Sequence, residues 1–366
     1  MAPVRVALLG AGIYARDAYV PLLLRQVPDD LQLTHVWSRS QSSVNELLPI
    51  IKESLPNVTA HWGEDGLEAI LSNPDVEAVI VVLAVQAMLK VVEQALGHGK
   101  HVLQEKPVGC SFAEAAEAIA RYRAMPKALW NYGENYRFEE VFLQARDICK
   151  NLGKIVKLDL VADMAMNEEN KYFRSDWRRD AEGCPGGFMM ESSVHFIGAL
   201  RLVAQGCGCG EPVLASGLAL NAVPDKLPPP DTVIGWLKFE SGVPAGVSFT
   251  FAALQVKWAL RVIGVDGTLE ILRGGGGGHR GCYTLRYKTP SMTDETEVQV
   301  GFTGMERELR QFAGQVNARK RECTADASDA AIRAQPEQGA RDIAVFEALW
   351  RSSKQHGMPV VVETMD

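Results

Sequence analysis

Glu191 and His195 are four residues apart in a stretch that reads as a helix, and so they share one face of it. An imidazole beside a carboxylate can take up and release a proton near neutral pH, which is the chemistry of a general acid–base pair. The same stretch is also typical of a capped helix with a half-buried histidine. Taken alone, the stretch favours this structural interpretation, so a catalytic role for Glu191 and His195 needs support from other motifs in the chain.

A glycine-rich turn near the first residues predicts a site for a dinucleotide. A strand that is buried on both faces ends there, and Gly10 and Gly12 follow it directly. Glycine allows a sharp turn and a close approach of the backbone to a pyrophosphate, while Ala15 lets the next helix pack tightly. That helix, expected at 13–26, offers free N–H groups at its start, and a second strand follows at 31–37. This strand–helix–strand order favours dinucleotide binding over a tight turn without a ligand.

Glu105, Lys106 and Pro107 follow a strand expected at 101–104, at the carboxyl end where parallel sheets bind their ligands. A lysine at this place could donate to the ribose of a nicotinamide cofactor and to a substrate oxygen, and could relay a proton. Pro107 fixes the backbone after it and allows a cis bond. The alternative is an ordinary ion pair on the surface, which the two charged residues alone would favour.

The end of the second strand bears on the choice of cofactor. A carboxylate at this place would bind the ribose 2′-hydroxyl of NAD, but the chain has Ser38, Arg39 and Ser40. An arginine between two hydroxyls suits a 2′-phosphate, which favours NADP over NAD. The alternative is an ordinary basic turn.

The first part of the chain predicts the element order of an α/β fold. Apolar strand-like runs alternate with helical stretches up to about residue 138, which is typical of a doubly wound parallel sheet of the Rossmann type. Strands are expected at 6–9, 31–37, 58–62, 76–84, 101–104 and 129–132. Helices are expected at 13–26, 43–55, 66–72, 87–97 and 111–123.

The pattern then changes, and we expect a dinucleotide-binding domain at 1–138 followed by an α+β substrate and oligomerisation domain at 139–366. Strand-like runs joined mostly by turns predict a large, mainly antiparallel sheet. They lie at 155–164, 214–222, 233–239, 243–252, 260–265, 269–272, 283–287 and 298–302. Helices are expected at 139–151, 186–203, 305–318 and 338–355, and the five glycines at 274–278 read as a hairpin loop.

Composition narrows the function classes. No run approaches the roughly 18 apolar residues of a membrane span, and the chain of 366 residues enters its first strand at once, so we expect neither a membrane anchor nor a signal peptide. The net charge of −7 without a basic block argues against nucleic acid as a partner. Seven scattered cysteines predict reduced thiols in the cytoplasm, and no further ligand completes a metal site around Cys207 and Cys209.

These motifs together resemble one family, named Gfo/Idh/MocA after glucose–fructose oxidoreductase, inositol dehydrogenase and a rhizopine-catabolism protein. The resemblance is carried by the turn from Gly10 to Ala15, the segment from Gly99 to Pro107, and the stretch from Gly186 to His195. Weaker similarities span nearly the rest of the chain, in the family's order: Asn135 to Phe138, Trp177 and Arg178, Gly264 to Glu270, and Gly339 to Asp342.

The resemblance implies hydride transfer between C4 of a nicotinamide and the carbinol or carbonyl carbon of a sugar, a polyol or a small carbonyl compound. It implies that Lys106 orients the substrate and relays the proton, that His195 is the general acid–base, and that Glu191 stands where the family usually has Asp. It also implies a homodimer or homotetramer formed through the second sheet. The residues expected to bind the cofactor are Gly10, Gly12, Ile13, Tyr14, Ser38, Arg39, Ser40, Leu83, Gln86, Glu105, Lys106, Asn135, Trp177 and Arg178.

The chain departs from the family pattern at several positions. Glu191 is one methylene longer than Asp, Ser193 replaces a usual Gly, and Gly198 replaces a second frequent Asp. The usual Thr-Pro-Asn after the fourth strand is replaced by residues 83–88. The chain therefore has fewer carboxylates than a typical polyol site of the family, and a small aldehyde or ketone is an alternative substrate. The alternative function is a dinucleotide-binding sensor that regulates a protein partner without catalysis.

Overall fold

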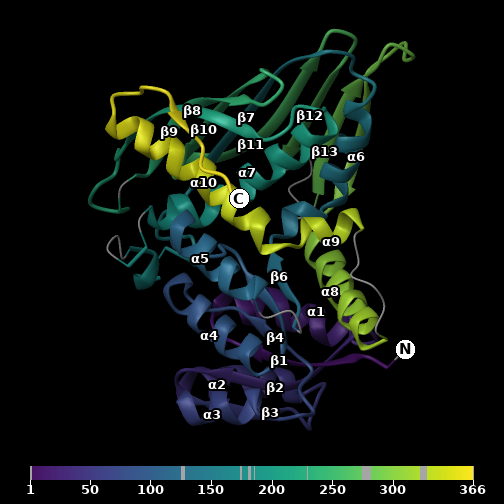
Figure 1. The fold of residues 1–366 in the computed structure, drawn as a ribbon, viewed down its shortest axis with the longest axis vertical. Helices are drawn as coiled ribbons and strands as arrows, with labels where there is room; N and C mark the ends of the chain where they lie inside the picture. The colour runs from purple at the N-terminus through teal and green to yellow at the C-terminus, as the bar shows by residue number, and fades with distance from the viewer. Residues whose placement is uncertain are drawn as a thin grey trace. The chain divides into compact units, whose positions relative to one another are not determined.

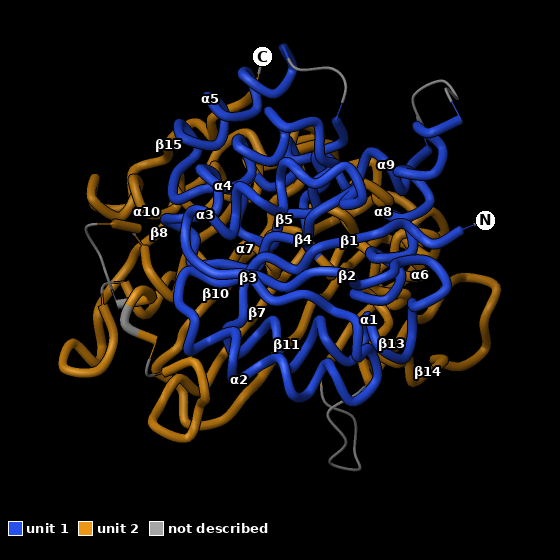
Figure 2. Tube along the Cα trace, turned by 90° about the horizontal axis from the view of Figure 1, so that it is seen from below, with its two compact units in different colours: residues 1–134, 305–339 blue, residues 135–304, 340–366 orange. Residues whose placement is uncertain are grey.

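The computed structural model describes residues 2–124, 128–173, 175–179, 183–184, 186–228, 230–273, 282–321 and 328–365. The chain divides into two compact units (Figure 2). The first comprises Met1–Glu134 and Met305–Gly339, and the second comprises Asn135–Gly304 and Ala340–Asp366. The predicted hairpin loop at 274–278 lies outside the described residues.

The first unit contains a six-stranded parallel sheet with the strand order β3-β2-β1-β4-β5-β6. Its strands are β1 (Val4–Leu9), β2 (Leu31–Ser38), β3 (Thr59–Trp62), β4 (Ala78–Val81), β5 (His101–Glu105) and β6 (Trp130–Gly133). All four residues of β4 are buried, as an interior strand of a covered parallel sheet requires. The order reverses direction between β1 and β4, which is where sheets of this kind bind dinucleotides. The predicted doubly wound sheet is confirmed.

Helices cover both faces of this sheet: α1 (Val20–Arg25), α2 (Gln41–Lys52), α3 (Gly63–Leu71), α4 (Val85–Gly97) and α5 (Phe112–Arg123). In Figure 2, α1 and α2 lie on one side of the strands and α4 and α5 on the other. The helix expected at 13–26 contains a π-helical turn, η1 (Ala15–Tyr19), before α1. Val20 N–H donates to the carbonyl of Ala15, five residues back, as in a π-helix. Pro21, the next residue, has no N–H to donate.

The first unit also includes chain that we assign from sequence to the second domain. Helix α8 (Gly304–Lys320) buries Leu309, Phe312, Ala313 and Val316 in the core of the first unit. Its Lys320 pairs with Glu77 at 2.6 Å. The short helix α9 (Asp329–Arg333) follows within the same unit. The boundary at residue 138 is thus close to the end of the first segment, but 305–339 return to the first unit because the apolar face of α8 completes its core.

The second unit contains a nine-stranded sheet with the order β14-β13-β12-β11-β7-β10-β9-β8-β15. The strands are β7 (Ile155–Ala165), β8 (Pro212–Leu220), β9 (Thr232–Phe239), β10 (Pro244–Thr250), β11 (Ala252–Gly264), β12 (Thr268–Arg273), β13 (Cys282–Lys288), β14 (Thr296–Gly301) and β15 (Val360–Val361). Neighbours are antiparallel except for β7 and β10, which are parallel. The predicted large, mainly antiparallel sheet is confirmed.

One face of this sheet is covered by helices. Figure 1 shows α6 (Glu140–Cys149), α7 (Gly187–Gly206) and α10 (Pro336–Lys354) beside the strands, and α6 and α7 contact the sheet. Two short 3-10 helices are η2 (Asn135–Phe138) and η3 (Asp176–Arg179). Within the described residues, no helix has the length and apolar character needed to cross a bilayer.

Candidate active site

The two glycines of the N-terminal turn are required for different reasons. Gly10 has a φ of +132°, and a Cβ at this position would lie 2.0 Å from the carbonyl oxygen of Val82. A Cβ on Gly12 would meet no atom within 4 Å. Gly10 is therefore needed by the packing of the sheet itself, whereas Gly12 faces open space. That space lies where β1 passes into the following helix, so the turn fits the pyrophosphate of a dinucleotide.

Other expected cofactor residues gather at the same edge of the sheet. Ile13 and Tyr14 are half-buried, and the Tyr14 hydroxyl donates to Met305 Sδ at 3.3 Å. The Tyr14 ring packs edge-on against Tyr19 with 5.8 Å between the ring centroids. Leu83 and Gln86 lie just after β4, at the start of α4. All of these positions follow the carboxyl ends of β1 and β4.

The segment after β2 contains a cation that is accessible to a ligand. Ser40 is the N-cap of α2, and its Oγ accepts from Ser43 N–H at 3.4 Å. Ser38 is half-buried, whereas Arg39 is exposed. Across the described ranges, the Arg39 guanidinium takes part in no ion pair or hydrogen bond. Its charge is therefore available to a phosphate, although the Ser40 hydroxyl already caps a helix.

Lys106 directly follows β5, and its neighbour Glu105 is buried rather than on the surface. Glu105 is 6% exposed. Its Oε1 accepts from the Tyr19 hydroxyl at 2.7 Å, and its Oε2 accepts from Lys106 N–H at 2.9 Å. Burial raises the pKa of Glu105 to about 7, against the opposing effects of the Lys106 charge and the Tyr19 hydrogen bond. The bond between Lys106 and Pro107 is cis. Glu105 is thus part of the interior of the first unit, while Lys106 is half-buried.

In the second unit, Glu191 pairs with a cation that sequence spacing does not reveal. Arg178 on η3 donates to both Glu191 oxygens at 3.2 Å, and also to Ser175 Oγ at 2.9 Å. The guanidinium lies over the ring of Trp177, 4.1 Å from its centroid, and 4.9 Å from that of Tyr172. The charge of the Glu191 carboxylate is therefore balanced by Arg178, whose guanidinium lies against the rings of Trp177 and Tyr172.

His195 lies one turn further along α7, on the same face as Glu191. Its ring stacks on Tyr136 with 4.8 Å between centroids and an interplanar angle of 24°. The Tyr136 hydroxyl accepts from Arg273 at 2.8 Å. His195 is half-buried. This arrangement fixes the imidazole plane, as a proton-transferring group requires.

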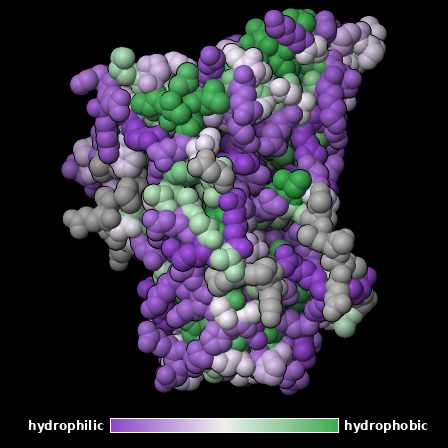
Figure 3. Space-filling view, in the orientation of Figure 1, coloured by the Kyte–Doolittle hydropathy of each residue, from purple (hydrophilic) through white to green (hydrophobic). Residues whose placement is uncertain are grey.

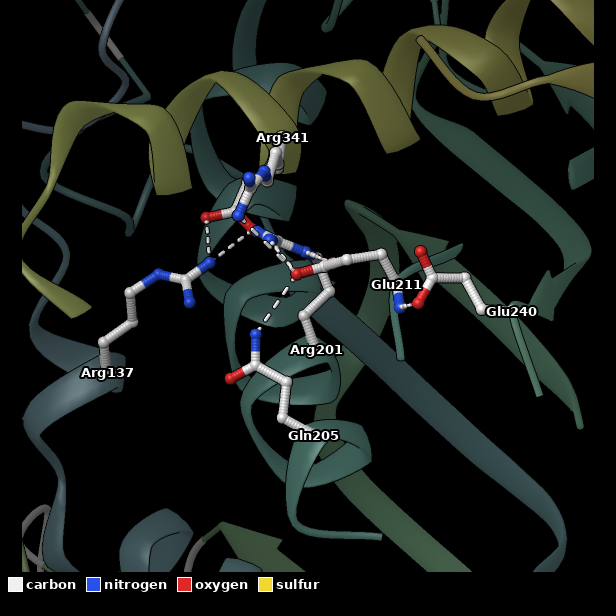
Figure 4. A network of polar contacts seen from close by, with 7 residues as sticks. Arg137, Arg201, Gln205, Glu211, Glu240 and Arg341 are labelled. Atoms are coloured by element: carbon white, nitrogen blue, oxygen red, sulfur yellow. Dashed lines mark hydrogen bonds and ion pairs between the residues drawn. The ribbon is translucent and has the colours of Figure 1, made fainter. Parts of the chain in front are cut away.

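A buried ion network anchors the helix that holds these residues (Figure 4). Arg137 of η2 donates to both oxygens of Asp342 on α10 at 2.6 and 2.7 Å, and Arg201 of α7 donates to the same carboxylate. Arg201 also pairs with Glu211 at 2.7 Å. Burial opposes the ionisation of Glu211, yet the charge of Arg201 lowers the pKa of Glu211 to about 2. The network ties α7 to η2, to α10 and to Glu211, the residue before β8.

The candidate residues therefore form two groups. In the first unit, the glycine turn, Arg39 and Lys106 follow the carboxyl ends of β1, β2 and β5. In the second unit, Trp177, Arg178, Glu191 and His195 lie on η3 and α7, and Asn135 begins η2. Sequence reasoning missed Tyr19 as a polar partner, because a tyrosine on the apolar side of a helix has the pattern of an ordinary core residue.

Comparison with known proteins covers both units. Residues 4–132 match the oxidoreductase family described as having an NAD-binding Rossmann fold, and residues 148–362 match the C-terminal alpha/beta domain of the same family. The chain is 30% identical over 237 residues to dehydrogenase FPY6 of Fusarium mangiferae. This alignment covers 63% of this chain and 66% of that protein. It is 25% identical over 233 residues to a 1,5-anhydro-D-fructose reductase of Ensifer adhaerens, covering 61% and 67%.

The fold is also that of a solved structure in complex with NAD⁺. An inositol dehydrogenase homolog of Azotobacter vinelandii superposes with a TM-score of 0.79 at 16% identity, covering 98% of this chain and 97% of the other. The alignments with the two curated relatives span about two thirds of each relative's length. The chain belongs to the Gfo/Idh/MocA oxidoreductase family, with its NAD-binding Rossmann fold and its C-terminal alpha/beta domain.

Proposed function

We propose that the protein is an NADP-dependent oxidoreductase, which transfers a hydride between nicotinamide C4 and the carbonyl or carbinol carbon of a sugar, polyol or small carbonyl compound. The observation that carries this proposal is the place of Lys106 directly after β5, at the same sheet edge as the open turn at Gly12. The relatives named as an anhydrofructose reductase and an inositol dehydrogenase homolog support the reaction class.

Lys106 and His195 handle the proton in this proposal. The bound nicotinamide supplies or accepts the hydride. Negative charge grows on the substrate oxygen as a carbonyl is reduced, and a donor aimed at that oxygen stabilises it. The Lys106 ammonium orients the oxygen, and His195, held by its stacking on Tyr136, is the general acid–base. In the opposite direction the same two groups receive the proton.

NADP is preferred over NAD because of the segment after β2. This segment contains an exposed guanidinium, Arg39, and no carboxylate to bind a ribose 2′-hydroxyl. An arginine recognises phosphate through charge-assisted hydrogen bonds. Ser38 and Ser40 flank it, and either hydroxyl adds a donor for a 2′-phosphate.

We propose a substrate that carries few hydroxyl groups. Glu191 stands where a polyol site would use a carboxylate, but both of its oxygens accept hydrogen bonds from Arg178. A carboxylate engaged in this way is a weaker acceptor for further hydroxyls. The rings of Trp177 and Tyr172 beside it favour an apolar part in the substrate.

Self-association through the second sheet is part of the proposal. Leu218, Ile234 and Trp236 are 63%, 54% and 40% exposed on the face opposite to the buried residues of β8 and β9. On the side that it draws, Figure 3 shows apolar patches over the part where Figure 1 draws the second unit, but it labels none of these three residues. A second copy of the chain would cover such a face, because contiguous exposed apolar surface is typical of an interface.

We place the protein in the cytoplasm. The six cysteines among the described residues are free thiols: Cys110, Cys149, Cys184, Cys207, Cys209 and Cys282. Free thiols are typical of reducing compartments.

The decisive experiment replaces Lys106. Lys106→Ala should lower kcat/KM at least about 100-fold on any carbonyl or polyol that the wild type converts, the usual scale for a lost acid–base group. Lys90→Ala is the matched control, since Lys90 is an exposed lysine on α4. Circular dichroism and thermal unfolding show whether each variant is folded. A loss of less than threefold would contradict the assignment of Lys106.

A regulatory sensor is the second candidate, because Glu191 is held by Arg178 instead of being open to a substrate. A sensor should bind NADPH, show no turnover on a panel of aldehydes, ketones, sugars and polyols, and keep its regulatory effect in Lys106→Ala. Turnover that is lost in this variant excludes the sensor.

A further inference from the structure

Trp62 exposes a large aromatic ring at the end of β3, next to the segment assigned to the 2′-phosphate. Trp62 is the last residue of β3 and is 44% exposed. The strands β2 and β3 are neighbours in the parallel sheet (Figure 1), and Trp62 pairs with Ser38, the last residue of β2. Arg39 directly follows Ser38. Because neighbouring strands lie about 4.8 Å apart, the indole and the guanidinium belong to adjacent positions at the carboxyl edge of the sheet.

The ring of Trp62 is accessible to a ligand. Trp62 is the N-cap of α3, but its side chain caps no backbone N–H. Within the ranges that the structure describes, the indole takes part in no hydrogen bond and stacks on no other ring. Tryptophan is highly buried on average in folded proteins. An indole that is exposed at the edge where such sheets bind ligands therefore offers a flat apolar surface to one.

The backbone after Trp62 is held in place, and space is left beside it. The indole N–H of Trp37, a residue that is 3% exposed, donates to the carbonyl of Gly63 at 2.8 Å. Gly63 has a φ of +68°, and a Cβ at this position would meet no atom within 4 Å. The turn is therefore anchored by a buried donor before any ligand arrives. A surface that is already ordered loses less conformational entropy on binding.

The charges at the ends of β2 and β3 favour different chemical groups. Arg39 supplies a positive charge after β2, whereas α3 begins with the exposed carboxylates Glu64 and Asp65. A phosphate is attracted by the guanidinium and repelled by the two carboxylates. A neutral base with an amino group is compatible with carboxylates, which only accept hydrogen bonds. The start of α3 therefore suits the base of a nucleotide better than its phosphate.

We propose that Trp62 forms the adenine site of the cofactor, with the purine stacked on its indole while Arg39 binds the 2′-phosphate. The inference rests on the proposed function, in which the chain binds NADP. In a dinucleotide fold of this type the adenosine ribose lies at the end of the second strand. Adenine and the 2′-phosphate are attached to neighbouring carbons of that ribose. Beyond β2 the sheet has one further strand, β3, and Trp62 is its last residue.

The two residues then have separate effects on cofactor choice. Stacking is available to NADP and to NAD alike, because both contain adenine. Trp62 therefore raises the affinity for both cofactors, whereas Arg39 discriminates between them.

Calorimetric titration with adenosine 2′,5′-bisphosphate tests the base contact without turnover, because this nucleotide has the base and the 2′-phosphate but no nicotinamide. Trp62→Leu should weaken its binding about 10-fold, the scale of one base stacked on an aromatic ring. Trp62→Phe keeps a ring and should weaken it less than about threefold. Trp350→Leu is the control, since Trp350 is a half-buried tryptophan on α10 of the second unit. Circular dichroism shows whether each variant is folded.

Tryptophan fluorescence gives a readout that a purely structural role of Trp62 would not change. A base stacked on an indole quenches its emission by direct contact. Adenosine 2′,5′-bisphosphate should therefore quench the emission of the wild type and of Trp350→Leu. The quenching should be lost in Trp62→Phe, although calorimetry still detects binding. Quenching that persists in Trp62→Phe, or equal affinities of the wild type and Trp62→Leu, overturns the inference.

The outcomes distinguish this inference from the proposed function. If Arg39→Ala weakens binding of the nucleotide and Trp62→Leu does not, the preference for NADP is supported and the adenine site at Trp62 is refuted. If ADP binds as tightly as adenosine 2′,5′-bisphosphate and Trp62→Leu weakens both, the adenine site is supported and the preference for NADP is refuted. If the wild type binds neither nucleotide nor NADPH, the proposed function fails, and the inference fails with it.

Discussion

At the scale of single residues, burial decides what a charged side chain can do. Glu105 and Arg39 are both charged residues at the carboxyl end of a strand in the first unit. Glu105 is 6% exposed and its pKa is raised to about 7, mainly by burial. Arg39 is exposed to solvent. The carboxyl group of Glu105 is therefore shielded from solvent, whereas the guanidinium of Arg39 is accessible from it.

The buried Glu105 should make stability depend on pH. The pKa rises from 4.5 to about 7 on folding, so the folded state retains a proton that the unfolded state has lost. The stability contributed by this group is present below pH 4.5 and is lost as the pH rises through about 7. Relative to Glu105→Gln, the wild type should lose up to about 3 kcal/mol of unfolding free energy over this range. Urea unfolding of both proteins at pH 5 and pH 8 measures the difference, and parallel pH dependences would contradict it.

Removing the Arg39 guanidinium should affect one cofactor only. Arg39→Ala should weaken NADPH binding by about 1.5–3 kcal/mol, the range for a hydrogen bond to a charged group, and leave NADH binding nearly unchanged. Fluorescence titration with both cofactors measures this. Arg25→Ala is a suitable control, since Arg25 is an exposed arginine at the end of α1, which returns to the opposite edge of the sheet. Equal losses for NADPH and NADH would remove the argument for NADP.

At the scale of elements, two glycines in one turn have separate tasks. Gly10 lets β1 pass closely over the backbone that follows β4, with a φ that L-residues rarely adopt. Gly12 leaves space above the turn. The sequence motif contains both, but only the contacts distinguish the glycine needed for folding from the one that leaves room for a ligand.

Alanine at each position should separate folding from binding. Gly10→Ala should destabilise the protein by more than the roughly 1–3 kcal/mol of backbone strain, because the added Cβ also meets the Val82 carbonyl at 2.0 Å. Gly12→Ala should change the unfolding free energy by less than about 1 kcal/mol. It should nevertheless weaken NADPH binding by at least about 10-fold, or 1.4 kcal/mol. Thermal unfolding and NADPH titration distinguish the two variants, and unimpaired binding by Gly12→Ala would contradict the placement of the pyrophosphate.

At the scale of the whole molecule, the second sheet has one face covered by helices and one face that is exposed. Buried and exposed residues alternate along β9, where Val233, Leu237 and Phe239 are buried while Ile234 and Trp236 are exposed. Leu218 of β8 lies directly opposite Ile234. The exposed apolar side chains of β8 and β9 are therefore neighbours on the same face of the sheet. We propose that a second copy of the chain covers them.

Charged residues on this face should reduce self-association. Leu218→Lys combined with Ile234→Lys should lower the mass measured by light scattering, because two buried charges oppose any close contact. Ile50→Lys on α2 is the control, since Ile50 is 42% exposed outside this sheet. Circular dichroism verifies that the fold is retained. An unchanged mass above that of a single chain would place the interface elsewhere.

Sequence alone determined the features that depend on local spacing. The alternation of strands and helices, the glycine turn, the lysine after β5 and the pair on α7 are set by neighbours within a few residues, and the motifs they form identified the family. The two sheets followed from hydrophobic patterns, because periodicity reports which face of an element is buried.

Tertiary structure decided which partners these residues meet. Tyr19 reaches Glu105 across 86 residues of sequence, and Arg137 reaches Asp342 across 205. Helix α8 joins the first unit although it follows the second in the chain. No local pattern encodes such contacts, because the cost of burying a charge depends on which distant groups fold against it. The sequence therefore located the candidate residues, whereas folding determined their partners and their protonation.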